Sequence, residues 1–235
     1  MSATALPGSG TPVDSIAEVI ARLEAIDAAL PEADGLACFN RMYLDVTRQV
    51  SSQLGQGFFA DPAFMTQLDV TFANLYFEAV DAAADGTAVP LAWRPLVDRR
   101  DMAEIEPIQF ALAGMNAHIN HDLPLAMTGT CAARNTAPDA GPHPADYQKV
   151  DQVLDAAEQS IRQSFESAAE LDVDQHLTAV ANLIGSWTIN SARDLAWNNC
   201  LLLWALRDDR LARGLFTDTL AASTALAARM LLVAV

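Results

Sequence analysis

Residues 15–31 read Ser-Ile-Ala-Glu-Val-Ile-Ala-Arg-Leu-Glu-Ala-Ile-Asp-Ala-Ala-Leu-Pro, and this stretch decides the fold class. Ser15 and Glu18 have the spacing of a capping box, in which two side chains satisfy free N–H groups at the start of a helix. The apolar residues that follow recur at intervals of three and four, which places them on one face of a helix. Pro31 then ends the pattern, because proline lacks the N–H that a continuing helix needs.

The same helical period returns along most of the chain, whereas the alternation typical of strands never persists. Asp61-Pro62 has the form of an N-cap followed by proline at the first helical position, and it opens a second well-marked helix. The apolar stripe of this helix covers residues 64–79. Similar stripes predict helices over residues 36–50, 150–165 and 177–187.

Five segments between and after these stripes carry distinct expectations. A helix should run from Pro107 to His121 or Asp122, because Pro124 disfavours helical geometry at the residue before it. Residues 195–206 are apolar on nearly every side and should form a central helix, against which a last helix over about 217–232 would pack. Residues 128–144, rich in glycine and proline, should form a long loop, and residues 86–101 a connection with room for one short helix.

We therefore predict an all-α protein: a compact single-domain bundle of about seven to nine helices with a central apolar helix. Residues 13–235 would form this domain, and residues 1–12, rich in small residues, would be a flexible N-terminal tail.

The net charge of −16 excludes some partners, because it repels phosphate backbones and anionic membrane surfaces. Nucleic acid is therefore not an expected partner. Three widely spaced cysteines indicate neither a disulfide framework nor a thiolate metal site, which fits the cytoplasm. We find no export signal, and the longest apolar stretch is too short and too interrupted to span a membrane.

The candidate site lies at the end of the helix predicted after Pro107. His118, His121 and Asp122 are spaced at i, i+3 and i+4, so their side chains project from neighbouring positions on one face. The apolar residues Ile108, Ala111 and Met115 precede them on that face. Because the polar trio continues a stripe that should face the core, we expect the three side chains to be buried and to need partners.

Two kinds of chemistry fit this trio. In the first, Asp122 orients one imidazole while the other works as an acid or a base near neutral pH, and a nearby helix C-terminus would favour the imidazolium form. In the second, His118, His121 and Asp122 supply three ligands to one divalent metal ion. A third interpretation is structural: the histidines bond buried carbonyl groups, and Asp122 helps to end the helix.

Several other residues are candidates to line the same cavity and bind substrate. Asn74 and Glu78 form an i, i+4 polar pair, with Tyr76 between them, although a solvated helix face would also explain the pair. Arg193 and Trp197 share one side of their helix, where they could bind an anionic or flat group or simply pack. Asn116 and Met115 complete the set, Asn116 as a substrate-holding amide and Met115 as a wall residue that also fits a core.

Four stretches resemble an actinobacterial family of helical proteins, a domain of unknown function. They are residues 59–65, 68–79, 109–126 (Gln-Phe-Ala-Leu-Ala-Gly-Met-Asn-Ala-His-Ile-Asn-His-Asp-Leu-Pro-Leu-Ala) and, more weakly, 191–197. The resemblance implies a shared helical fold and brings no activity with it. Relatives near genes of secondary metabolism would point to a small apolar substrate.

His118, Asp122, Pro124 and Leu125 also resemble a His-x-x-x-Asp and Pro-Leu pattern of the helical zinc phospholipase C and nuclease superfamily. This chain has Ala126 where that pattern continues with histidine, and it has only four histidines in all. These departures count against a trinuclear zinc site and leave a mononuclear relative open.

From the sequence we expect a small-molecule enzyme that performs cyclisation, elimination or hydrolysis on an apolar substrate. The competing expectation is a noncatalytic ligand-binding or interaction protein in which the cluster cements the core. The 128–144 loop and the last helix could each serve a homodimer interface.

Overall fold

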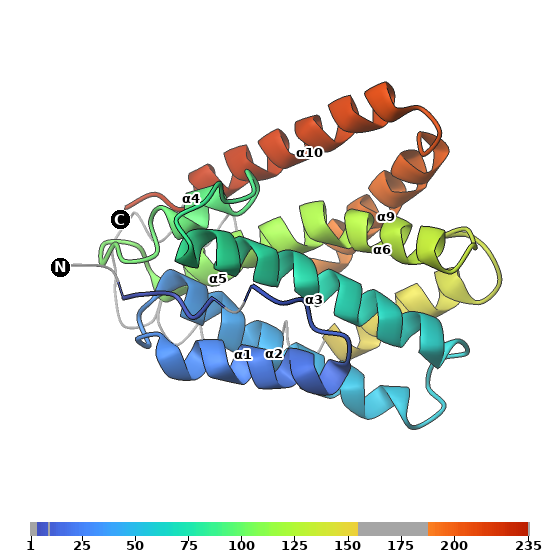
Figure 1. Ribbon diagram of the computed structural model, residues 1–235, viewed down its shortest axis with the longest axis horizontal. Coiled ribbons are helices and arrows are strands. Elements are labelled where there is room, and N and C mark those ends of the chain that lie inside the picture. The colour runs from blue at the N-terminus through green and yellow to red at the C-terminus, as the bar shows by residue number, and fades with distance from the viewer. Residues whose placement is uncertain (1–3, 9, 155–187, 235) are drawn as a thin grey trace.

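The structure, a computed structural model, describes residues 4–8, 10–154 and 188–234 (Figure 1). Every regular element in these ranges is a helix, as the sequence predicted. The elements are α1 (Ile16–Ala29), α2 (Gly35–Leu54), α3 (Pro62–Ala84), α4 (Arg94–Val97), α5 (Pro107–Ala117), η1 (His118–Asp122), α6 (Leu123–Ala133), α9 (Ile189–Ala205) and α10 (Arg210–Leu231). Most of the 150–165 stripe and the whole 177–187 stripe lie outside the described residues.

Polar caps begin the helices where the sequence places them. The Ser15 hydroxyl accepts the Glu18 N–H at the start of α1, and the Asp61 carboxylate accepts the Phe64 N–H at the start of α3. The short helix α4 lies in the connection over residues 86–101, as expected. The last helix starts earlier than predicted, because Asp209 accepts the N–H groups of Leu211 and Ala212 and so caps α10.

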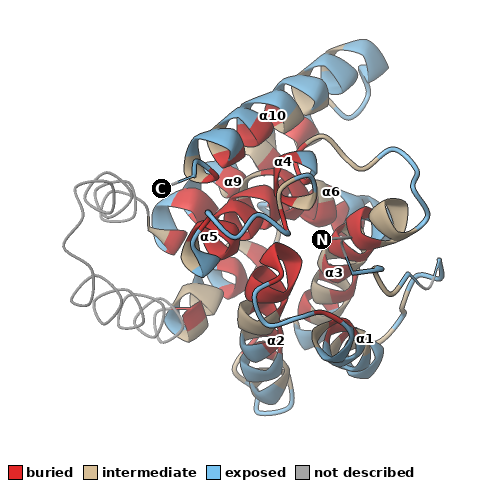
Figure 2. Cartoon of the chain, turned by 90° about the vertical axis from the view of Figure 1, so that its left-hand side faces the viewer, coloured by how far each residue is buried: buried red, intermediate tan, exposed pale blue. Residues whose placement is uncertain are grey.

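The most deeply buried helix is α5, not the 195–206 segment. All of its residues from Gln109 to Ala117 are buried, with α2 on one side and α10 on the other (Figure 2). The Gln109 amide nitrogen donates there to the backbone carbonyls of Leu231 and Val233, and its amide oxygen accepts the Glu106 N–H. The prediction of a central α9 was wrong, since α9 leaves Leu195 53% exposed and buries only one face. Accordingly, α10 packs mainly on α5 rather than on α9.

The helix predicted to end at His121 or Asp122 continues instead. Residues His118–Asp122 form one π-helical turn, in which the Leu123 N–H bonds to the His118 carbonyl, and α6 follows without a break. Pro124 has no N–H and its ring would crowd the carbonyl four residues earlier in an α-helix. The wider π turn accommodates the proline near the start of α6, so the helical run survives.

The predicted 128–144 loop is shorter than expected at both ends. Residues up to Ala133 belong to α6, and residues 143–154 are helical again. The connection that remains, 134–142, holds Asn135 and Gly141 at positive φ. The glycine and proline residues thus indicated a loop correctly, but the predicted loop was too long.

The described part of the N-terminal segment lies against the helices. Leu6 packs on the core, the Arg100 guanidinium donates to the Thr4 carbonyl, and Asn74 holds the backbone of Val13. In Figure 1 this segment runs along α1 and α3 before α1 begins. None of the helices described is sufficiently long and apolar to cross a bilayer.

Candidate functional site

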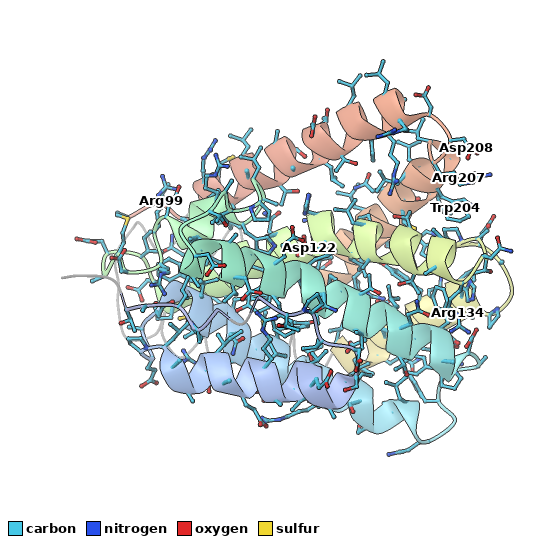
Figure 3. The ribbon with its side chains drawn as sticks, in the orientation of Figure 1. Arg99, Asp122, Arg134, Trp204, Arg207 and Asp208 are labelled. Atoms are coloured by element: carbon cyan, nitrogen blue, oxygen red, sulfur yellow. The ribbon has the colours of Figure 1, made fainter. Side chains whose placement is uncertain are left out.

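Asp122 is the hub of a buried hydrogen-bond network at the π turn, near the middle of the molecule (Figure 3). Its Oδ2 accepts the indole N–H of Trp93 at 2.9 Å and lies 3.2 Å from Nδ1 of His118. Its Oδ1 lies 2.7 Å from Nδ1 of His121. Because both imidazoles turn Nδ1 toward a carboxylate, which can only accept, we assign the ring proton to Nδ1 in each.

The ring of His118 lies inside a box of aromatic side chains. Phe72 stacks flat on it, with ring centroids 3.5 Å apart and planes 6° apart. Tyr43 meets it edge-on at 4.4 Å. Three more rings surround the imidazole at centroid distances of 5.6 to 6.2 Å: Phe39, Trp93 and Tyr76. This packing fixes the plane of the ring, and the bond to Asp122 fixes which nitrogen faces away.

The free nitrogen of His118 is its Nε2. This atom is sealed from solvent, and it makes no hydrogen bond with any part of the chain that the structure describes. Burial lowers the pKa of His118 more than the neighbouring Asp122 carboxylate raises it, so the imidazole is neutral near pH 7. Nε2 therefore has an available lone pair.

The carboxyl of Asp122 behaves in the opposite way. Burial raises its pKa, but the hydrogen bonds from His118 and His121 outweigh burial, and the pKa lies below its usual value. A neutral imidazole that donates Nδ1–H to a carboxylate is the arrangement that prepares a histidine as a base.

A cavity of about 100 Å³ adjoins His118. Its walls come mainly from α2, α3 and the helical segment 143–154, with smaller contributions from the π turn and α9, and most of its lining side chains are apolar. They include Met42, Val46, Val50, Met65, Leu68, Phe72, Met115, Ile119, Leu123, Val150, Leu154 and Ile189. This volume is smaller than the about 150 Å³ of an engineered apolar cavity in another protein that holds benzene, so it favours a ligand of only a few heavy atoms.

Three of the lining residues each have a buried polar atom without a hydrogen-bond partner among the described residues: His118 Nε2, Tyr43 Oη and Asp69 Oδ2. Thr47 lies one turn after Tyr43, and its hydroxyl donates to the Tyr43 carbonyl at 2.8 Å. Thr47 also lies near the phenol and lowers the pKa of Tyr43, but burial raises that pKa more. Leaving a buried polar group unpaired costs about 1 to 3 kcal/mol. Three such atoms around one cavity are therefore expensive unless a ligand pairs with them.

The sequence interpretation missed Tyr43 and Asp69. Burial raises the pKa of Asp69 from 3.8 to about 7 and raises that of Tyr43 well above its usual value. The spacing of Asp69 in the sequence could have identified it. Asp69 shares a helix face with Phe72 and Tyr76, at i, i+3 and i+7, so a carboxyl group lies on a face that is otherwise aromatic.

Some predicted site residues do lie near the cavity. His118, Met115 and Arg193 line it, and Tyr76 packs beside His118 with its hydroxyl 3.3 Å from the Asn40 amide oxygen. The Arg193 guanidinium donates to the Asp151 carboxylate and to the Tyr147 carbonyl, and it covers the Tyr147 ring. Its charge is thus already paired.

The structure places the other predicted residues elsewhere. Asn116 donates to the Thr224 carbonyl of α10 at 2.9 Å, and Asn74 binds Val13. Glu78 is exposed. His121 and Trp197 are not among the cavity-lining residues; Trp197 packs on Tyr147 at 4.8 Å.

The metal variant gains no support from the described residues. Among them, no three or more His, Cys, Asp and Glu side chains gather in a way that could hold a metal ion. The reason at the π turn is geometric, because His118 and His121 both direct Nδ1 at Asp122 and so occupy the carboxylate oxygens that a metal would need.

Comparison with known protein families matches residues 16–234 to the model of a Family of unknown function (DUF5995). Neither the curated proteins nor the solved structures contain a match. The match confirms the resemblance to a domain of unknown function and extends it from four stretches to nearly the whole sequence. The chain belongs to DUF5995, a family of unknown function.

Proposed function

We propose that the protein is an enzyme that moves a proton on a small, largely apolar molecule, with His118 as the base. The observation that carries this proposal is the orientation of one side chain. His118 turns Nδ1 toward Asp122, lines an apolar cavity, and has an Nε2 with no hydrogen-bond partner among the described residues. A buried base with a free lone pair next to a ligand-sized space is the basic requirement for abstracting a proton.

Each residue of the network has a role in this step. His118 takes the proton at Nε2 and becomes an imidazolium. Asp122 keeps the ring in the required tautomer and stabilises the positive charge as it forms, in the way that a buried aspartate supports a catalytic histidine. Trp93 and His121 hold the carboxylate in place through its two oxygens. His118 then returns the proton, so no net change in the enzyme remains.

The cavity supports a small substrate with little charge. Its walls are mostly aliphatic and aromatic, and the guanidinium of Arg193 is engaged by Asp151. Eliminations and cyclisations that begin with loss of a proton fit a lone base in such a space, whereas the metal-assisted route lacks a ligand cluster in the described ranges.

The proposal also includes the cellular compartment, the kind of metabolism and the partners of the protein. We place the activity in the cytoplasm and in secondary metabolism, with a small molecule rather than nucleic acid as the partner. The three cysteines, Cys38, Cys131 and Cys200, are free and buried, which is compatible with a reducing compartment. The exposed apolar side chains of α10, among them Leu211 and Leu215, would suit a homodimer contact.

A noncatalytic binding protein is the second candidate. One observation favours it: the aromatic box around His118 would also be explained by a core that simply packs an imidazole. If the protein is of this kind, replacing His118 would change the free energy of unfolding but would abolish no catalytic activity.

The test compares two buried, stacked histidines. His143 lies 3.9 Å from the Phe64 ring and bonds the Ala137 carbonyl, away from the cavity. A panel of small carbonyl compounds, esters and alcohols is incubated with wild type, His118→Gln and His143→Gln, and products are measured by mass spectrometry. We expect His118→Gln to lose about 100-fold or more in kcat/KM and His143→Gln to keep it. Equal activity of His118→Gln and wild type would reject the proposal.

A further inference from the structure

We propose that the substrate is a small carbonyl compound whose oxygen is held by Tyr43 and Asp69 while His118 removes a proton from the adjacent carbon. The inference rests on the proposed function and names its substrate class. Its basis is three cavity-lining residues from separate elements, each with a buried polar atom that has no hydrogen-bond partner among the described residues: Tyr43 Oη in α2, Asp69 Oδ2 in α3 and His118 Nε2 in the π turn.

The placement of these groups follows from the packing around His118. Phe72 stacks on the imidazole at 3.5 Å, and Asp69 precedes it by one helical turn on the same face of α3. Tyr43 lies 4.4 Å from the imidazole centroid and 6.2 Å from the Phe72 centroid. The imidazole thus lies between α2 and α3, and each of these helices contributes one cavity-lining residue with an unpaired polar atom.

The chemistry of the three atoms complements a carbonyl group next to an acidic C–H bond. A phenol and a protonated carboxyl are both hydrogen-bond donors, whereas the His118 Nε2 lone pair is an acceptor. Two donors can share one carbonyl oxygen, which has two lone pairs. The Asp69 pKa of about 7 keeps this carboxyl protonated in mildly acidic solution, where it can donate.

The titratable and charged groups around the cavity support the neutral form of Asp69. They are Tyr43 on α2, His118 on the π turn, Tyr147 in the helical segment 143–154 and Arg193 on α9. The arginine is committed to Asp151 and the Tyr147 carbonyl, and burial is the cause of the raised pKa of Asp69. Nothing among these groups supplies a free cation for an ionised Asp69.

The reaction balances without any co-reactant. His118 Nε2 takes the proton from the carbon beside the carbonyl, and the C–H electron pair becomes a carbon–carbon double bond. The carbonyl π pair moves to oxygen, where the hydrogen bonds from Tyr43 and Asp69 stabilise the enolate. The imidazolium, paired with Asp122, then returns the proton to the same carbon or to a conjugated one. The outcome is hydrogen exchange or isomerisation.

The first test uses 4-nitrophenol, whose phenolate oxygen mimics the enolate oxygen. Binding is measured for wild type, Tyr43→Phe and Asp69→Asn, and for Asp45→Asn as a control that removes one exposed charge from α2. We expect each cavity variant to weaken binding about 10- to 100-fold, the effect of one hydrogen bond to a charged oxygen, with no change in the control. Unchanged binding in Tyr43→Phe and Asp69→Asn would overturn the inference.

A second measurement needs no variant and so survives any folding defect. After correction for ionisation of the free probe, the affinity of wild type for 4-nitrophenol should fall as pH rises through about 7, because Asp69 loses the proton that it donates. A constant affinity would contradict the inference. Benzylamine serves as the opposing probe, and tight benzylamine binding that Asp69→Asn abolishes would mark a cation site instead.

Deuterium exchange separates this inference from the function on which it rests. Cyclohexanone is incubated with each protein in D2O, and incorporation beside the carbonyl is followed by NMR. Loss of exchange in His118→Gln, Tyr43→Phe and Asp69→Asn supports both proposals. Loss in His118→Gln alone keeps the base and rejects the carbonyl-binding pair, whereas exchange that persists in His118→Gln rejects the base itself.

Discussion

The indole N–H of Trp93 donates to Asp122 Oδ2 across 2.9 Å, and this bond joins the segment before α4 to the π turn. Trp93 is fully buried, and its ring also packs 5.2 Å from Phe39 and 5.1 Å from Tyr76. One side chain therefore positions the carboxylate and fills the wall of the aromatic box.

Replacing Trp93 with Phe should destabilise the protein by about 2 to 4 kcal/mol. The change removes a bond to a charged acceptor and leaves a void where the larger ring was. Urea unfolding at neutral pH measures the loss. Trp204→Phe is the matched control, since Trp204 is only half-buried and holds Arg207 at 5.1 Å; we expect less than about 1 kcal/mol there. Equal losses in the two variants would contradict the role given to Trp93.

Gly114 permits the close approach of Phe39 to α5. A Cβ added at Gly114 would lie 2.4 Å from Phe39 Cγ, so Gly114→Ala forces the ring away from the aromatic box. We expect a net destabilisation of about 1 to 3 kcal/mol despite the better helix propensity of alanine, together with weaker 4-nitrophenol binding.

The control for Gly114 lies in α10. Gly214 is exposed within that helix, and a Cβ there would meet nothing within 4 Å. Gly214→Ala should stabilise the protein by about 0.5 to 1 kcal/mol. If Gly114→Ala were stabilising to the same extent, the packing of Phe39 against α5 would be much looser than described.

Asp69 should make the free energy of unfolding fall as pH rises. Its folded pKa of about 7 exceeds the ordinary value of 3.8, so the folded state binds the proton more tightly between these limits. Stability from this group is complete below about pH 4 and is lost progressively up to about pH 7, a total of about 2 to 4 kcal/mol. Asp69→Asn removes the dependence. Its advantage over wild type, measured by urea unfolding, should therefore be larger at about pH 8 than at about pH 5; an equal advantage at both would show that Asp69 has an ordinary pKa.

We expect Asn74 to hold the N-terminal segment in place and to have no effect on ligand binding. Its side chain makes two hydrogen bonds of 2.9 Å with the backbone of Val13. Asn74→Ala should cost about 1 to 2 kcal/mol and speed proteolysis before α1, while 4-nitrophenol affinity stays at the wild-type value. Glu78→Ala, on the exposed face of the same helix, should change neither. Loss of probe affinity in Asn74→Ala with slow proteolysis would return Asn74 to the site that the sequence suggested.

Local signals in the sequence were sufficient for most of the fold. Ser15 and Asp61 are caps whose hydrogen bonds reach only three residues, and apolar stripes need only the helical period. The same locality explains why His118 and Asp122 were correctly expected to meet, since they lie one turn apart. Information of this kind is contained within a few neighbouring residues.

Errors arose where the outcome depends on distant contacts. Pro124 appeared to end a helix, but a π turn absorbed it, and that turn is stabilised by the burial of α5 and α6 among other helices. The apolar α9 was expected at the centre, yet the more uniformly buried helix is α5, whose polar Gln109 and Asn116 find partners on α10 and just beyond it. Composition alone does not reveal such partners.

The site was predicted only in the part that is local in sequence. Tyr43 and Asp69 come to His118 from two other helices, 75 and 49 residues before it by their numbering, so no spacing rule links them. Each was hidden inside a helical stripe. Their unpaired polar atoms become visible only once the helices are packed.

The assignment of His118 as the base depends most directly on which of its ring nitrogens carries a proton, and nitrogen-15 NMR of histidine-labelled protein measures this. Assignment uses His118→Gln, which removes one set of signals and leaves those of the other three histidines. We predict that His118 carries its proton on Nδ1 with an unprotonated Nε2 at neutral pH, and that it gains a second proton only below the usual pKa of histidine. A protonated Nε2 near pH 7, whether in the other tautomer or in the imidazolium form, would contradict the assignment of His118 as the base.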